Sequence, residues 1–124
     1  MNNCSCIYVG EYDGPEFYDR KIVKARKVHK CCECGREIVF AEEYENICGK
    51  WDGVFSLYKT CLDCVAIREA MFCEGWYFET MIDDLIEHIR YAGGGISEDC
   101  LAGLPPRARG LVCDLIEDYW EDME

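Results

Sequence analysis

The sequence predicts an α+β fold: a small zinc-stabilised treble-clef module (knuckle, β-hairpin and helix) followed by an α-helical hairpin. Three observations predict it. Two C-x-x-C pairs stand at a spacing typical of zinc sites. A strand–turn–strand pattern lies between them, and two amphipathic segments follow them. We therefore expect residues 1–76 to form the cysteine-rich zinc-binding module and residues 77–124 an acidic helical extension packed on it.

The two C-x-x-C pairs are Cys31/Cys34 and Cys61/Cys64, and 26 residues separate Cys34 from Cys61. Each C-x-x-C loop can direct two sulfur atoms at one point, so two loops supply the four thiolates of a tetrahedral structural zinc site. Gly35 follows the first pair, where a tight knuckle favours a residue that accepts a positive φ. These four cysteines are the first predicted metal site.

The segment between the pairs predicts a β-hairpin that leads into a helix. Apolar residues recur from Tyr44 to Trp51, Asp52-Gly53 is a favourable two-residue turn, and Val54 to Tyr58 form the return strand. Thr60 is expected to cap a helix that begins near Cys61 and carries the second cysteine pair in its first turn. A helix N-terminus suits thiolates because its free N–H groups stabilise negative sulfur.

Four further cysteines predict a second zinc site. The set is Cys4, Cys6, Cys32 and Cys73. Cys32 lies inside the first knuckle and must point away from the sulfurs of its neighbours. With this site the chain would hold two Zn²⁺ ions, and Cys48, Cys100 and Cys113 would remain as small buried hydrophobic residues. The alternative is that the first two cysteines are free thiols at a disordered terminus.

The composition predicts one domain, or one domain with a helical extension, that stays in a reducing cytoplasm. Half of the 124 residues are hydrophobic, enough for a small core that a metal would help to stabilise. No apolar run is long enough for a transmembrane span, and the first residues lack the regions of a signal peptide. The eleven cysteines are odd in number, which together with the absent export signal favours metal ligation over disulfides.

The flanking segments predict the remaining elements. Residues 7–9 are a candidate strand, and residues 20–30 fit a helix or an extended arm equally well. After the zinc module, Thr80 can cap a helix that the glycines at 93–95 stop, and Ser97 can cap a short turn. Pro105-Pro106 then begins the last helix, whose apolar face runs from Leu111 to Trp120 and includes Cys113.

Charge is distributed unevenly along the chain. The formal net charge is −12. Residues 20–36 hold seven of the thirteen basic residues and one acid, whereas residues 74–124 hold thirteen acids against three arginines, a local net charge of −10. Such a surface repels phosphate backbones and favours basic partners.

Three stretches of the sequence resemble small uncharacterised cysteine-rich proteins of tailed bacteriophages and prophages. They are residues 24–36, Gly49-Lys50-Trp51-Asp52-Gly53 and Tyr58-Lys59-Thr60-Cys61, and Cys4-Ser5-Cys6 with Asp13-Gly14-Pro15-Glu16-Phe17 is similar too. The resemblance covers about residues 4–75. It implies a phage origin and a role inside an infected bacterium, and it carries no reaction or substrate.

The first functional hypothesis is a non-catalytic module that binds a host protein with a basic surface and so inhibits or modulates a host factor or defence system. The predicted partner surface is the acidic outer face of the last helix, formed by Asp114, Glu117, Asp118, Glu121 and Asp122. An acidic protein can also occupy a nucleic-acid channel on its target by imitating phosphate charge.

The alternative is nucleic-acid binding through the basic segment 20–36. Its predicted phosphate contacts are Arg26, Lys27, Lys30 and Arg36. The overall charge opposes strong binding, and the same segment could simply be a solvated one that offsets the negative zinc–thiolate site.

An enzyme is the least favoured hypothesis. Nucleases of the HNH type place histidines on the hairpin and helix of a treble clef, but this chain holds only His29 and His88, and no histidine follows Cys64 in the predicted helix. A closed four-thiolate zinc has no open position for water. We therefore expect no catalytic residues.

Overall fold

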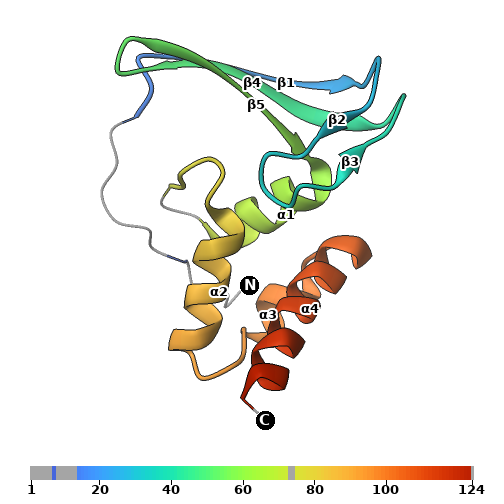
Figure 1. Ribbon diagram of the computed structural model, residues 1–124, viewed down its shortest axis with the longest axis vertical. Coiled ribbons are helices and arrows are strands. Elements are labelled where there is room, and N and C mark those ends of the chain that lie inside the picture. The colour runs from blue at the N-terminus through green and yellow to red at the C-terminus, as the bar shows by residue number, and fades with distance from the viewer. Residues whose placement is uncertain (1–6, 8–13, 73–74, 124) are drawn as a thin grey trace.

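A three-stranded sheet stands on a layer of helices in the computed structural model, which describes residues 7, 14–72 and 75–123 (Figure 1). Of the predicted strand at 7–9 only Ile7 is among these residues. Cys4, Cys6 and Cys73 lie outside them. The described residues form a mixed α+β structure with antiparallel strands and four helices. None of these helices is long and apolar enough to cross a membrane.

The main sheet has the order β1–β4–β5, with both pairs antiparallel. Strand β1 spans Phe17–Lys24, β4 spans Glu43–Trp51 and β5 spans Val54–Cys61. The predicted turn joins β4 to β5, with φ of 50° at Asp52 and 80° at Gly53; two positive φ values match the twist of the flanking strands. The ambiguous segment 20–30 is not a helix: residues 20–24 belong to β1 and pair with β4, and residues 29–30 follow as a second short strand after a bend at Arg26 and Lys27.

A second, two-stranded sheet frames the first cysteine pair. Strand β2 (His29–Lys30) pairs antiparallel with β3 (Glu37–Ile38), and the knuckle lies between them. Helix α1 (Leu62–Met71) follows β5 without a loop. The predicted cap at Thr60 is wrong. Cys61 occupies the N-cap position of α1, without a side-chain hydrogen bond. Thr60 is still in β5, with its hydroxyl 3.3 Å from the sulfur of Cys32.

The remaining helices are α2 (Met81–Tyr91), α3 (Glu98–Ala102) and α4 (Pro106–Asp122), which begin after Thr80, Ser97 and Pro105 as expected. Neither Thr80 nor Ser97 caps its helix through the side chain. The glycines after α2 contact the aromatic end of α4. A Cβ atom on Gly94 would lie 2.6 Å from rings of Tyr119 and Trp120, and the Trp120 indole donates a 2.7 Å hydrogen bond to the Gly94 carbonyl.

One continuous core joins the sheet half to the helical half. It contains Ile38 and Tyr44 from the strands, Ile67 from α1, Leu85 from α2 and Val112 from α4. The buried stripe of α4 is Ala108 and Val112. Cys113, expected on this apolar side, is exposed, because one further residue turns the side chain about 100° away from the stripe.

Helix α1 covers one face of the main sheet through a buried ion-pair network. Glu45 of β4 is fully buried, and Arg68 of α1 donates hydrogen bonds of 2.8 and 2.5 Å to its two carboxylate oxygens. Arg20 of β1 donates a third, at 2.5 Å. Burial raises the pKa of Glu45, but the two arginines lower it more, so its net pKa lies below the usual value.

Candidate metal centre

The first half of the centre is a tight backbone turn at Cys31–Gly35. The N–H of Gly35 donates to the carbonyl of Cys31 at 3.1 Å, and Gly35 has a φ of 77°, as its position after the cysteine pair predicted. The N–H of Glu33 points at the sulfur of Cys31, 3.4 Å away. The turn is joined to β5 by a hydrogen bond from the N–H of Cys32 to the carbonyl of Lys59.

The second half comes from the junction of β5 with α1. Cys61 is the last residue of the strand, and Cys64 lies in the first turn of the helix. The N–H of Cys61 donates to the sulfur of Cys31 at 3.4 Å, so a backbone group at the helix start faces the cluster. The orientation matches the expected stabilisation of thiolate charge by a helix N-terminus.

The four cysteines meet at one point. The sulfurs of Cys31, Cys34, Cys61 and Cys64 all lie within 4.8 Å of one another, and those of Cys34 and Cys61 are 3.9 Å apart. Tetrahedral zinc with bonds of about 2.3 Å separates its sulfurs by about 3.8 Å. Cys31, Cys61 and Cys64 are buried, and Cys34 is partly exposed. The donor set and its spacing fit one tetrahedral metal ion such as Zn²⁺.

All four thiols can be deprotonated at once only if a cation lies among them. Hydrogen bonds from the other three sulfurs lower the pKa of Cys31, whereas the hydrogen bonds with Cys31 raise the pKa of Cys61 and Cys64, since a second negative sulfur beside the first is unfavourable. A divalent ion at the centre of the cluster removes this conflict, because it attracts all four sulfurs at once.

Arg36, just after the knuckle, is held by two carboxylates. Arg36 donates to both oxygens of Glu42, at 3.1 and 2.5 Å, and lies 3.5 Å from a carboxylate oxygen of Asp63 in the first turn of α1. The hydrogen bonds from Arg36 lower the pKa of Glu42. Arg36, a predicted phosphate contact, is therefore already paired with two carboxylates and only about a quarter exposed.

Glu33 links the knuckle to the helical half. Its carboxylate accepts the backbone N–H of Glu79 at 3.0 Å and that of Met81 at 3.1 Å. It therefore acts as the side-chain cap of α2, which Thr80 does not provide. Burial raises the pKa of this carboxyl more than the two backbone donors lower it. No local sequence signal reveals this role, because the donor and acceptor are 46 residues or more apart.

The structure does not show the second predicted zinc site. Of its members only Cys32 lies among the described residues, where its sulfur contacts the Thr60 hydroxyl at 3.3 Å and a Glu33 oxygen at 3.5 Å. Burial raises the pKa of the Cys32 thiol to about 12. Among the cysteines expected to be spare, Cys48 is half-buried and free, whereas Cys100 is buried and disulfide-bonded, contrary to the expectation of a free thiol.

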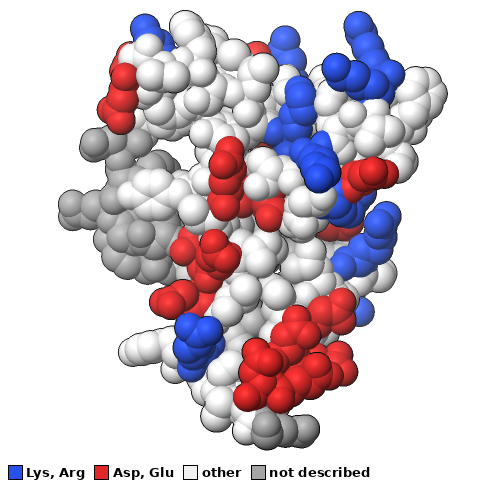
Figure 2. All heavy atoms as spheres, in the orientation of Figure 1, with Lys and Arg blue, Asp and Glu red and all other residues white. Residues whose placement is uncertain are grey.

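The two predicted partner surfaces lie at opposite ends of the molecule. All five acidic residues of α4 are exposed, and Figure 2 shows the acidic side chains gathered over the lower helices and the basic ones over the sheets. Arg26, Lys27 and Lys30 are exposed near β2. No carboxylate in the part of the chain that the structure describes is within ion-pair distance of these three cations.

The two histidines do not come together at the cluster. His29 lies in β2 with its ring 5.4 Å from that of Tyr44, and burial together with Lys59 and Lys27 lowers its pKa. His88 lies in α2. Within residues 7, 14–72 and 75–123, the four-cysteine cluster is the only group of three or more potential ligands close enough to share a metal ion.

Comparison with known proteins identifies no relative. No family model, no curated protein and no solved structure matches the chain.

Proposed function

We propose that this protein is a non-catalytic, zinc-stabilised binding module of the treble-clef type. The observation that carries the proposal is the closed cluster of four cysteine sulfurs, brought together from a knuckle and a strand–helix junction. The order of knuckle, hairpin and cysteine-bearing helix supports the finer assignment to a treble clef.

A structural role for the metal is supported by its surroundings. Four thiolates would fill the coordination sphere of zinc and leave no position for a substrate or water. Cys31, Cys61 and Cys64 also belong to the continuous core, so the metal would hold together the point where β5, α1 and the knuckle meet. A second zinc remains a prediction: Cys32 would have to exchange its contact with Thr60 for one with Cys4, Cys6 and Cys73.

The proposed partner surface is the acidic outer face of α4. Its five carboxylates (Asp114, Glu117, Asp118, Glu121 and Asp122) are exposed and project from a helix whose opposite side is anchored in the core. A host protein with a basic surface is the partner that such a face would attract. Together with the resemblance to phage proteins, this supports inhibition or modulation of a host factor or defence system in the bacterial cytoplasm.

The test is affinity capture from an expressing bacterium with a charge-reversed helix. Changing Glu117, Asp118, Glu121 and Asp122 to lysine should leave zinc content and the circular dichroism spectrum unchanged, because all four side chains are exposed. It should abolish capture of the partner, and the wild-type interaction should weaken with salt because screening acts beyond about 10 Å at 0.1 M. Undiminished capture by the reversed variant would exclude α4 as the partner surface.

A further inference from the structure

One face of the main sheet is covered by β2 and the knuckle at its Tyr44 and Cys61 end, and no other described element covers the rest of it. The register places on this face, from β1, β4 and β5, the following residues: Phe17, Asp19, Lys21, Val23, Tyr44, Asn46, Cys48, Lys50, Phe55, Leu57, Lys59 and Cys61. The opposite face carries Glu45 and Ile47 and is covered by α1 and the segment that leads into α2. In Figure 1 the strands β1, β4 and β5 extend beyond the helices, which lie on the other side.

Large apolar side chains stand in the open on this face. Phe17 is 49% exposed, Phe55 is 66% exposed and Leu57 is 63% exposed. The rings of Phe17 and Phe55 meet edge to face, with their centroids 6.5 Å apart. Isolated exposed apolar residues are common on protein surfaces, but a contiguous patch of them indicates a binding surface.

Cations accompany the aromatic residues. The Lys50 ammonium lies 5.5 Å from the centre of the Phe55 ring, and that of Lys59 lies 5.5 Å from the centre of the Tyr44 ring. The strand residues of this face include three lysines and one carboxylate, Asp19, which is 3.7 Å from Lys21. Glu16, just before β1, lies 3.9 Å from Lys50, so the lysines on and beside this face exceed the carboxylates by one.

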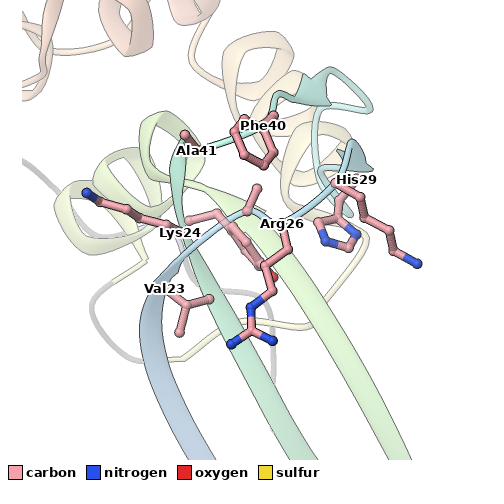
Figure 3. Close-up of a pocket in the computed structure, with 9 residues that line it drawn as sticks. Val23, Lys24, Arg26, His29, Phe40 and Ala41 are labelled. Carbon is pink, nitrogen blue, oxygen red and sulfur yellow. The ribbon is translucent and has the colours of Figure 1, made fainter.

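A pocket of about 780 Å³ continues the face at the end of β1. Its lining contains Arg26, Lys27 and His29 together with the rings of Phe40 and Tyr44, and no carboxylate. Figure 3 shows Arg26, His29 and Phe40 around the hollow, whereas the Lys24 side chain points to the side opposite His29. Phe40 is 71% exposed, so its ring is free to contact a ligand.

We propose that this face and its pocket bind single-stranded nucleic acid. Phe40 would stack on a base at the pocket, Arg26 and Lys27 would contact its phosphates, and the strand would continue over Phe55 and Phe17 beside Lys59 and Lys50. Alternating rings and cations of this kind bind single strands because every base has a face that stacks on an aromatic ring. The inference goes beyond the proposed function and uses the opposite end of the molecule.

The combination of cations with exposed rings favours this occupant over a second copy of the chain. The acidic surface of another copy could pair with the lysines, but it would offer no bases to stack on Phe17, Phe40 and Phe55. The carboxylates of α4 lie at the far end of the molecule. Salt screens their repulsion of phosphate at distances beyond about 8 to 10 Å. Duplex nucleic acid could place phosphates beside the cations, but its bases are already stacked on one another and could not stack on the rings.

The experiment is fluorescence anisotropy of the zinc-loaded full chain with a labelled oligonucleotide of about 15 thymidines or uridines, at low and at physiological salt. The wild type should bind, and an unlabelled duplex of the same length should compete weakly. Phe40→Ala and Phe55→Ala should each weaken binding about 5-fold or more, the loss typical of one stacked base. Arg26→Ala with Lys27→Ala should lower the salt slope by about 1.4, for two lost phosphate contacts.

Matched changes at the helical end serve as controls. Tyr91 is 93% exposed and Arg90 is 67% exposed, both on α2, so Tyr91→Ala and Arg90→Ala remove the same kinds of side chain away from the sheet. They should leave binding unchanged, and the charge-reversed α4, which adds positive charge far from the sheet, should not weaken it. No binding at low salt, equal competition by duplex, or equal losses in the control variants would overturn the proposal. None of these outcomes affects the test of α4 as a protein-binding surface.

Discussion

The sheet half and the helical half reach stability by different means. In residues 14–72 three strands have one covered face and one partly open face, and the four-cysteine cluster joins the junction of β5 and α1 to the knuckle. In residues 75–123, α2 and α4 bury apolar side chains such as Leu85 and Val112 and carry their charges outside. A small sheet with an open face buries little surface, so a metal ion at the cysteine cluster would contribute stability that the core lacks.

The two halves are nevertheless connected by specific polar contacts as well as by the shared core. Glu33 of the knuckle caps α2, and Arg107 of α4 lies 3.8 Å from Asp63 at the start of α1. The aromatic ring of Phe78, in the segment before α2, stacks on Tyr58 of β5 with a centroid distance of 4.2 Å. These contacts fix the position of the two halves relative to each other.

The largest effect should follow loss of a metal ligand. Cys61→Ser removes one of four sulfurs, and structural zinc is worth about 10–16 kcal/mol of apparent binding free energy in small zinc modules. We expect loss of zinc by elemental analysis and loss of the sheet signals in NMR spectra. Chelation of the wild type should do the same. A folded, zinc-loaded Cys61→Ser protein would contradict the assigned centre.

The stoichiometry of zinc sharpens this result. One ion per chain is expected from the described cluster, and a second only if the set with Cys4, Cys6, Cys32 and Cys73 also binds. Should Cys32→Ala lower the zinc content from two to one, the second site is real. An unchanged content in that variant would remove Cys32 from the ligands.

The buried ion pair should give the next largest effect. Glu45→Gln leaves Arg68 buried without its counter-charge, a change that costs about 3–5 kcal/mol. Because the folded-state pKa of Glu45 is lowered, its stabilisation is present above the unfolded value near 4.5 and is lost as the pH falls through the folded value. The difference in unfolding free energy between wild type and Glu45→Gln should therefore shrink below about pH 4.5, as measured by urea titration. A pH-independent difference would argue against an ionised Glu45.

Removal of the α2 cap should have an intermediate effect on one half only. Glu33→Ala deletes two hydrogen bonds to backbone N–H groups at the start of α2, at a cost of about 2 kcal/mol. Hydrogen exchange should accelerate in α2 while the zinc content and the protection of β4 stay as in the wild type. Uniform acceleration over both halves would show that the two unfold as one unit.

The smallest effects are expected at the cysteines outside the cluster. Cys113 is exposed, so Cys113→Ala should change the unfolding free energy by less than about 0.5 kcal/mol, and Cys48→Ala, at a half-buried position, by about 1 kcal/mol at most. Both variants should keep their zinc. Release of zinc by Cys48→Ala would assign that residue to a metal site.

The local features of the fold could be predicted because their signals are short in sequence. Asp52-Gly53 marks the β4–β5 turn, Pro105-Pro106 marks the start of α4, and the C-x-x-C spacing brings two sulfurs to one point within a single turn. The prediction failed where a residue had two local options. Thr60 could cap a helix or continue a strand, and in the structure it lies within β5 with its hydroxyl 3.3 Å from the sulfur of Cys32.

The sequence by itself determined the four ligands, the hairpin, the order of the helices and the separation of basic from acidic segments. These depend on spacing, turn chemistry and composition, which act between neighbours in the chain. Only the tertiary structure decided that Glu33 caps α2, that Arg36 is paired with Glu42 and Asp63, and that Glu45 binds two arginines. It also decided which sheet face stays open, since both faces carry apolar residues and the choice depends on where α1 packs.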